Sequence, residues 1–525
     1  MGHETNIESI RALEKQIEDH RDERTIICLK RVRNSLLNIS ALPPETLGYI
    51  FHWNVIPEPT FEAELTKGSY NFLLVCHHWF EVASRTPELW GFWGNNLEDW
   101  KKRCLRSQAA PLNLVLGSKT GTLDGAVRNA LRDHATQDTI RHVRLRSGEP
   151  ELLSTILSTL ITDRERPRTI SLESFVLCTE DRIPTDVSDF FAHQHLPKLR
   201  HLALTGCTIS SWDYIMSRTT LLTTLVLEKT SPSPTTSQLL SILASNPHLE
   251  ELTLSRHMIP SDGGSESSLQ VKLHRLKRLD LAGRPPHLFE FIHHLEYPKR
   301  MDDLSIVVCD CSASDIRRTV GPYLQAHLRC HGKSEGGLEL FLMHRLVHDT
   351  SIILHVGEVS TKTHPPISVP PFASFIMILS EELDEEGLER LELDLITHVP
   401  LEEVVSIRSV MYPIIMTDLC PRLPNLAELF LVGVNMSTVF PTPDQGESRT
   451  YEAISPSLRH IYSIRNNHGW SALIGFLSYR ASVGNPILSL LVAGSHLSRE
   501  EVESIRRMVG EVRIDEVVPG FLGRC

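Results

Sequence analysis

The sequence predicts a mixed α/β protein, in which a short all-helical module is followed by a long solenoid of alternating strands and helices. Two observations lead to this fold class. Between residues 38 and 100, apolar residues recur with helical spacing in three short segments. From residue 101 onward, the chain returns every 20 to 29 residues or so to a strand-like pattern of alternating leucines. We therefore divide the chain into residues 1–37, 38–100 and 101–525.

Composition and charge restrict the function. The 525 residues include 53 basic and 65 acidic side chains, and the formal net charge of -12 argues against a whole-surface clamp on nucleic acid. No segment approaches the roughly 18 uninterrupted apolar residues of a membrane span, and the N-terminus lacks the apolar core of a secretory signal. The 10 cysteines are scattered, which fits a reducing compartment. We expect a soluble cytoplasmic or nuclear protein that binds neither nucleic acid nor membrane.

Residues 1–37 are expected to form one charged amphipathic helix, from residue 5 to about residue 37. Four apolar residues share one stripe: Ile7, Ile10, Leu13 and Ile17. A dimerising coiled coil would continue this stripe at positions 24 and 31, where the sequence has Arg24 and Arg31. We expect the helix to pack on its own chain, and a coiled coil is the alternative.

Three short helices are predicted between residues 38 and 100. The first begins at Pro43-Pro44, because proline at the first helical position loses no hydrogen bond. The second is predicted from apolar residues at positions 72, 75, 76, 79, 80 and 83, and the third begins at Thr86-Pro87-Glu88. Helices this short have little interior in which to bury so many large side chains. Part of the apolar surface is therefore expected to meet a partner.

Three segments of this module carry a family resemblance: Leu42-Pro43-Pro44-Glu45 with Leu47, Ile50 and Phe51, then Val75-Cys76-His77-His78-Trp79, then Pro87-Glu88-Leu89-Trp90. Their order and spacing resemble the F-box, the three-helix module that docks on the Skp adaptor of cullin-RING ubiquitin ligases. The whole layout is similar to the F-box-like proteins common in mushroom-forming fungi, the basidiomycete type. One departure is a long insertion at residues 54–70 with two prolines, Pro57 and Pro59, which could alter the rim of an adaptor interface.

The resemblance implies a substrate-recognition subunit of an SCF-type ubiquitin ligase, without catalytic residues or cofactors of its own. It would bind a Skp-family adaptor, and through it a cullin-RING ligase, and present an unknown target protein on the leucine-rich region. The residues implied to build or support the adaptor-binding surface are Leu42, Pro43, Leu47, Ile50, Phe51, Val75, Trp79, Leu89 and Trp90. The alternative is a non-catalytic interaction scaffold in which the helical module only caps the solenoid.

The repeating pattern of residues 101–525 is L-x-x-L-x-L, which places alternate leucines on one face of a strand. Its clearest copies begin at residues 199, 222, 249, 276 and 301, at intervals of 23, 27, 27 and 25 residues. These intervals are typical of leucine-rich repeats. Cys207 and Cys309 occupy the position at which that repeat prefers Asn or Cys. Each repeat is expected to contribute a strand and a returning helix, such as Ser237 to Ala244.

Weaker copies extend the array on both sides. They are Ile140-Val143-Leu145, Ile170-Leu172, Leu388-Leu391-Leu393, Leu426-Leu429-Leu431 and Leu458-Ile461. Residues 310–387 break the period, with a helix expected from Ser314 to His327 and a hairpin from Leu338 to Val356. We expect this irregular segment to belong to the same sheet. Residues 260–268 and 440–450 are expected to be loops, because they are rich in Gly, Ser, Pro and acidic residues.

A search for catalytic and metal-binding patterns identifies no site. His77-His78, His293-His294 and the pair Cys309 and Cys311 lack the paired spacing of a zinc site, so we expect no metal. The serine-nucleophile elbow and the zinc-hydrolase helix motif do not occur. Eight carboxylates between residues 381 and 394 could recognise a basic partner, although a solvated surface is the simpler interpretation. Arg141, Arg144 and Arg146 are the nearest candidate for a phosphate-binding cluster, and there we expect a solvated strand face.

Overall fold

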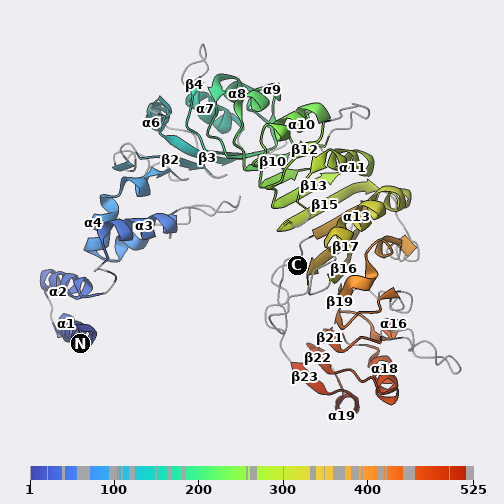
Figure 1. Ribbon diagram of the computed structural model, residues 1–525. Helices are drawn as coiled ribbons and strands as arrows, with labels where there is room; N and C mark the ends of the chain where they lie inside the picture. The colour runs from blue at the N-terminus through green and yellow to red at the C-terminus, as the bar shows by residue number, and fades with distance from the viewer. Residues whose placement is uncertain are drawn as a thin grey trace. The chain divides into compact units, whose positions relative to one another are not determined.

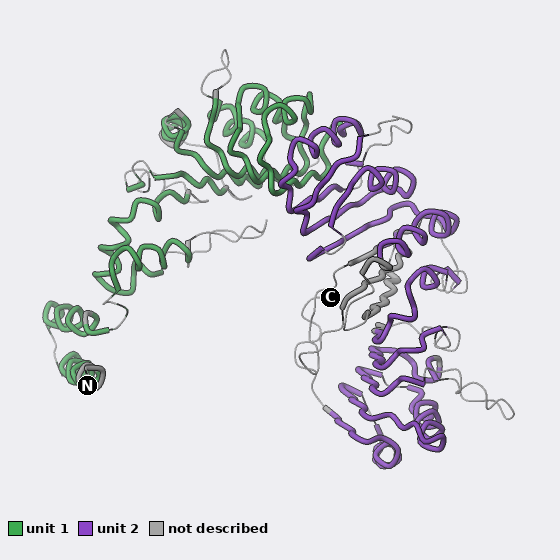
Figure 2. Tube along the Cα trace, in the orientation of Figure 1, with its two compact units in different colours: residues 1–232 green, residues 233–525 purple. Residues whose placement is uncertain are grey.

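The computed structural model confirms a mixed α/β fold with mostly parallel sheets (Figure 1). The chain forms two compact units, residues 1–232 and 233–525 (Figure 2). The structure describes residues 2–19, 22–37, 39, 42–55, 71–93, 103, 106–107, 110–116, 125–136, 138–147, 150–161, 168–179, 184–255, 258–259, 269–298, 301–331, 338–347, 349–358, 373–379, 390–391, 394–410, 419, 422–440, 456–466, 468–495 and 497–515.

Two helices occupy the N-terminal segment, so the expectation of one continuous helix is wrong. They are α1 (Gly2–Asp19) and α2 (Glu23–Ser35), and they contact each other. Asp22 has an extended backbone, and its side chain accepts a hydrogen bond from the Thr25 backbone N–H (2.8 Å). An aspartate that caps a new helix in this way competes with continuation of the preceding one.

The helical module consists of α3 (Pro44–Val55), the 3-10 helix η2 (Asn71–Leu74), α4 (His77–Ser84) and the 3-10 helix η3 (Pro87–Gly91). The helix starts at Pro44 and Pro87 agree with the sequence prediction. The second predicted helix is divided, because Cys76 has an extended backbone and caps α4. Its sulfur accepts a hydrogen bond from the Trp79 backbone N–H (3.5 Å). Residues before Cys76 therefore lie outside α4.

Parallel strands of the first unit pair in chain order: β1 (Phe92–Trp93), β2 (Leu112–Leu116), β3 (Ile140–Ser147), β5 (Ser174–Thr179), β8 (His201–Thr205) and β10 (Thr224–Glu228). The returning segments contain α6 (Gly125–Thr136), α7 (Pro150–Leu160), α8 (Ser188–His193) and α9 (Asp213–Arg218). Figure 1 shows α7, α8 and α9 together on one side of these strands. Two short parallel pairs, β4 (Arg168–Thr169) with β7 (Gln194–His195) and β6 (Thr185–Asp186) with β9 (Cys207–Thr208), accompany them.

The copy expected at Ile170-Leu172 is displaced, because the strand β5 begins only at Ser174. Phe175 and Leu177 pair with Val143 and Leu145 of β3, so they occupy the core positions of this strand. Because Phe175 occupies a position where the pattern expects leucine, the L-x-x-L-x-L pattern is not recognisable in the sequence of this strand.

The second unit also consists mainly of parallel strands separated by helices, and it contains one antiparallel strand. Its first paired strands are β11 (Glu251–Leu254), β13 (Arg278–Gly283) and β15 (Asp303–Cys311). Next to β15 lie β18 (Ala373–Leu379), β17 (Asp349–Glu358) and β16 (Leu338–Val347), with β17 antiparallel to both neighbours. The ladder then runs through β19 (Val404–Val410), β20 (Glu428–Val432), β21 (His460–Ile464), β22 (Ser489–Ala493) and β23 (Glu511–Asp515).

The helices of the second unit include the expected returning helix, α10 (Thr236–Ala244), which begins with a capping box formed by Thr235 and Gln238. The others are α11 (Pro285–His293), α12 (Ala313–Asp315), the π-helical η4 (Ile316–Val320), α13 (Gly321–His331), the 3-10 helix η5 (Leu401–Glu403), α16 (Met436–Val439), α18 (Trp470–Ser482) and α19 (Arg499–Met508). A short pair, β12 (Val271–Lys272) with β14 (Leu295–Glu296), flanks the ladder.

The irregular middle of the sequence agrees with its prediction. A helical segment covers Ser314 to His327, and the expected hairpin is the antiparallel pair β16 and β17. The hairpin joins the same sheet, because β18 pairs with β15 and β16 pairs with β19. Of the copy expected at Leu388-Leu391-Leu393, Leu388 and Leu393 lie outside the described residues. Leu391 is helical, so the expected strand is wrong at this position, and the next described strand begins at Val404. A single copy of so short a pattern does not establish a strand, because tertiary contacts override local preference.

The core follows the alternation of the leucine pattern. In the copies that begin at residues 199, 222, 249 and 276, all twelve leucines of the pattern are at most 2% exposed. Residues between them such as His201, Thr224 and Arg278 lie on the other face of the sheet and are half-buried or exposed, whereas Ala203 on that face is buried. None of the helices in the described ranges combines the length and the apolar character that crossing a bilayer requires.

Candidate functional site

The helical module of residues 42–92 has a small core of its own. Leu47 and Phe51 of α3 are buried against Leu89 and Trp90 of η3. The ring of Phe51 stacks on that of Phe72, with centroids 4.5 Å apart and an interplanar angle of 5°. The remaining buried members of this cluster are Val82, Ala83 and Phe92. The large apolar residues of the motif are therefore divided between this core and the surface.

Polar contacts fix the connection between α4 and η3. The Trp90 indole N–H donates to the Ala83 carbonyl (2.9 Å), and the Thr86 hydroxyl donates to the Val82 carbonyl (2.8 Å). Both bonds satisfy carbonyls at the end of α4, which a helix leaves without intrahelical partners. The guanidinium of Arg106 lies over the Trp90 ring, 4.4 Å from its centroid. The hydrogen bond to Ala83 and the contact with Arg106 therefore fix the position of the Trp90 ring, which lies in the core of the module.

The nine residues implied to build or support an adaptor surface divide into three groups. Leu47, Phe51, Leu89 and Trp90 are buried in the core, and Leu42 and Trp79 are partly buried and pack against it. Pro43, Ile50 and Val75 are exposed. The exposed group, and the exposed parts of Leu42 and Trp79, can contact another protein without rearrangement, while the buried group would act by holding the helices in position.

Further exposed apolar side chains lie beside these three and were not selected from the sequence. They are Tyr49 and Trp53 of α3, Leu74 of η2 and Phe80 of α4. The rings of Tyr49 and Trp53 meet edge to face with centroids 6.0 Å apart. These two aromatics lie on the side of α3 away from Leu47 and Phe51. Their i, i+4 spacing in the sequence already indicated that they share one helix face.

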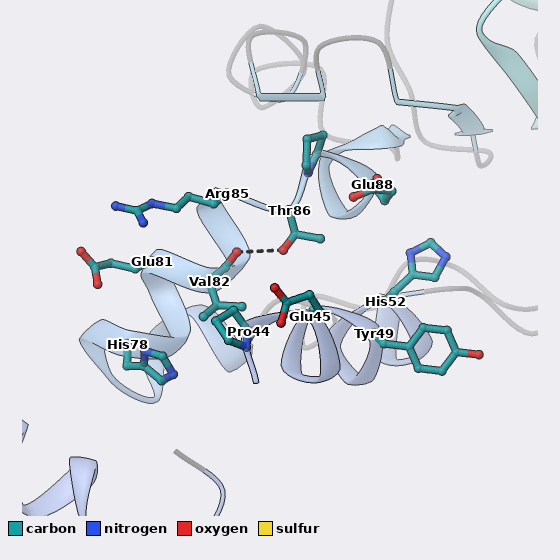
Figure 3. A pocket seen from close by; sticks show the side chains of 12 residues that line it. Pro44, Glu45, Tyr49, His52, His78, Glu81, Val82, Arg85, Thr86 and Glu88 are labelled. Carbon is teal, nitrogen blue, oxygen red and sulfur yellow. Dashed lines mark hydrogen bonds between the residues drawn. The ribbon is translucent and has the colours of Figure 1, made fainter. Parts of the chain in front are cut away.

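A pocket with an approximate volume of 630 Å³ lies between α3, α4 and η3. Its apolar lining includes Pro44, Gly48, Val82 and Pro87, and its charged lining consists of Glu45, Glu81, Arg85 and Glu88. Figure 3 shows the Glu45 carboxylate pointing from α3 toward Thr86, with Glu88 and His52 to one side of it and Arg85 and Glu81 extending from α4 on the other.

The charges of this pocket do not cancel. Three carboxylates and one guanidinium leave a formal charge of -2 when the histidines are neutral. Burial lowers the pKa of His52, and the carboxylate of Glu88 raises it by less. Glu45, Arg85 and Glu88 form no ion pair in the described part of the chain. The Glu81 Oε2 atom lies 3.6 Å from Nδ1 of the half-exposed His77.

Two histidines that line the pocket each have a buried ring nitrogen without a hydrogen-bond partner, Nδ1 of His52 and Nε2 of His78. A buried polar atom that lacks a partner costs free energy.

The structure also locates the other candidate groups of the sequence. Among the described residues there is no group of three or more His, Cys, Asp or Glu side chains that could hold a metal ion. Cys309 and Cys311 are buried in β15, and burial raises the pKa of Cys311 to about 12. Of the eight carboxylates between residues 381 and 394, only Asp394 lies within the described ranges, and it forms an ion pair with Arg317.

The arginines of β3 are less exposed than a solvated strand face would be. Arg144 is half-buried, and burial lowers its pKa. Arg141 donates to the backbone carbonyls of Asp138 (2.8 Å) and Ser171 (3.3 Å), so it ties β3 to the loop before β5. The expected loops at residues 260–268 and 440–450 lie outside the described residues, apart from the buried Phe440.

No protein-family model matches the chain, and a search of curated proteins finds no match.

Proposed function

We propose that this protein is the substrate-recognition subunit of an SCF-type ubiquitin ligase. The module of residues 42–92 would bind a Skp-family adaptor, and the strand–helix region would hold a target protein. Catalysis would belong to partner subunits, since the role of this chain is to raise the effective concentration of a target lysine near charged ubiquitin. The proposal rests on the resemblance of three ordered segments to the F-box motif.

One structural observation supports an adaptor surface in particular. The module closes a core around Leu47 and Phe51 and still leaves Ile50, Val75 and Phe80 exposed. Burying a large apolar side chain contributes about 1.5 to 3 kcal/mol, so a partner that covered these residues would gain affinity from them. On α3, Ile50 and Phe51 are 100° apart, which separates the outward face from the core face.

The proposed target-binding region is a leucine-rich-repeat-like solenoid. Its support comes from the strand spacing and from Asn466, which lies five residues after Ile461 at the position the repeat reserves for Asn or Cys. The Asn466 amide accepts from the Val434 backbone N–H and donates to the Leu431 carbonyl (2.9 Å). A buried side chain that bonds neighbouring turns in this way is what stacked repeats require.

Co-expression with a Skp-family adaptor followed by size-exclusion chromatography tests the adaptor proposal. We expect wild type to elute as a stoichiometric complex and the double variant Ile50→Glu, Val75→Glu to elute alone. The matched control is Val483→Glu, since Val483 is 54% exposed and Val75 is 55% exposed. Adaptor binding by the double variant, or its absence in wild type, contradicts the proposal.

Substitutions at the buried residues cannot test adaptor contact directly. Leu47 is fully buried, so Leu47→Asp would unfold the module and remove binding for a reason unrelated to contact. Variants at exposed residues separate these two causes, provided that circular dichroism of each variant matches wild type.

A scaffold in which the module only caps the solenoid is the second candidate. It is favoured by the pairing of β1 with β2, through which Phe92 at the end of the module aligns with Asn113 of the sheet. Deletion of residues 38–100 distinguishes the two functions. An adaptor-binding module can be removed with little effect on the remaining sheet, whereas loss of a cap lowers the thermal stability of the whole unit.

A further inference from the structure

We propose that the pocket between α3, α4 and η3 binds the cationic side chain of a protein partner, an arginine or lysine presented on a segment with apolar neighbours. This site goes beyond the adaptor proposal, because it depends on different residues and on a different kind of contact. Its carboxylates come from three separate elements, namely Glu45 from α3, Glu81 from α4 and Glu88 from η3.

Charge complementarity selects the occupant. The formal charge of the lining is -2, and the carboxylates of Glu45 and Glu88 have no cationic partner within the described residues. A cation placed between them would gain attraction to both, while an anion would be repelled. Arg85 is the only cation of the lining, and Figure 3 shows it extending from α4 on the side away from Glu88.

The rest of the lining suits the stem of a long basic side chain. Pro44, Gly48, Val82 and Pro87 provide apolar surface for methylene groups, because lysine and arginine bury their stems while the charged end reaches polar groups. Tyr49 stands at the edge of the pocket with its ring exposed, so it can lie against a guanidinium or ammonium group. The approximate volume of 630 Å³ exceeds one side chain and leaves room for the apolar neighbours of the cation.

The pocket and the proposed adaptor surface face different directions on the two helices, with Tyr49 between them. At 100° per residue, His52 of the pocket projects about 160° away from Ile50 around the axis of α3. On α4, Val82 of the pocket projects about 160° away from Phe80. A partner that occupied the pocket would therefore leave Ile50 and Phe80 open to a second protein.

Isothermal titration of the full-length chain with short peptides tests this inference. The probe is the acetylated amide Ala-Leu-Ala-Arg-Ala-Leu-Ala, and the control peptide has citrulline in place of arginine, which keeps the shape and removes the charge. We expect the arginine peptide to bind more tightly than the citrulline peptide, and its affinity to fall as salt is added. Equal binding of both peptides, or no binding of either, overturns the inference.

Variants locate the site on the chain. We expect Glu45→Gln and Glu88→Gln each to weaken binding about fivefold, and Arg85→Gln to strengthen it by a similar factor. The matched control Glu290→Gln, at an exposed carboxylate of α11, is expected to leave binding unchanged. A general loss of structure cannot produce the gain at Arg85. Unchanged affinity in the variant with both Glu45 and Glu88 replaced overturns the assignment to this pocket.

The peptide titration contains no adaptor. A negative result in this experiment therefore leaves the adaptor proposal intact.

Discussion

The side chain of Asn466 bonds to the backbone of Leu431, 35 residues earlier in the chain, through its amide N–H (2.9 Å). The same side chain accepts from the Val434 N–H and donates to the Ser463 hydroxyl (3.0 Å), and it is almost completely buried. The turn after β20 is therefore held by a residue of the turn after β21, so the two successive turns depend on each other.

We predict that Asn466→Ala lowers the free energy of unfolding by about 3 kcal/mol, because it leaves buried backbone groups of this turn without partners. The matched variant is Asn435→Ala. Asn435 is exposed and caps α16, and its replacement is expected to cost about 1 kcal/mol. Denaturant unfolding of the full-length chain measures both, and equal losses would contradict the role of Asn466.

Leu89→Ala is expected to destabilise the helical module by about 2 to 5 kcal/mol, since Leu89 is fully buried among the core residues of α3 and η3. Leu74→Ala at a residue that is 86% exposed is expected to change stability by less than about 0.5 kcal/mol. Hydrogen exchange of peptides from α3 reports the module separately from the sheet. Similar protection in both variants would show that Leu89 does not support the core.

Acidification is expected to destabilise the first unit. Burial lowers the pKa of His134 below the ordinary value of 6.5, and the residue is 8% exposed. The unfolded chain therefore takes up this proton at a higher pH than the folded chain does. The free energy of unfolding falls as the pH drops through 6.5, and this contribution levels off below the folded pKa.

Urea unfolding above and below pH 6.5 measures this effect. The variant His134→Gln should show a smaller loss on acidification than wild type, because glutamine does not titrate in this range. A loss of the same size in the variant would mean that His134 does not contribute.

Cysteine reactivity is expected to follow burial. Burial raises the pKa of Cys207 and of Cys311 to about 12, so almost no thiolate is present at neutral pH. Cys28 of α2 is exposed. In the native protein we expect a maleimide to modify Cys28 well before Cys207 or Cys311, as followed by mass spectrometry, and urea should abolish the difference. Early modification of Cys207 would contradict its buried position.

Loss of the cap at Asp22 is expected to weaken the start of α2. Asp22→Ala removes the acceptor for the Thr25 N–H and should cost about 0.5 to 2 kcal/mol of local stability. Hydrogen exchange in the first turn of α2 measures it, with α1 as the internal reference. Unchanged exchange at Thr25 would show that the break between the helices has another cause.

Several features of the fold could be predicted from the sequence because they depend on local periodicity. The alternating leucines around Leu202 and Leu279 predicted strands with one buried face, and the structure has them. The hairpin from Leu338 to Val356 was predicted in the same way. The copy at Leu388-Leu391-Leu393 was not confirmed, because its one described leucine, Leu391, is helical.

In the candidate site, the sequence identified apolar residues without separating core from surface. Leu47 and Ile50 both belong to the motif, yet Leu47 is buried and Ile50 is exposed. The helical period places them on different faces, but which face meets the core depends on where α4 and η3 pack. The pocket residues Glu45 and Glu88 are 43 residues apart in the sequence, and no local pattern connects them.

By itself, the sequence determined the helix starts at Pro44 and Pro87, the strands of the clearest leucine copies and the hairpin after Leu338, since hydrophobic period, proline starts and leucine spacing act over a few residues. The tertiary structure alone decided the position of β18 beside β15, the helix break at Cys76 and the meeting of Glu45 with Glu88 around one pocket. The physical reason is that strand pairing and side-chain burial depend on contacts between distant segments, and a local pattern allows more than one such partner.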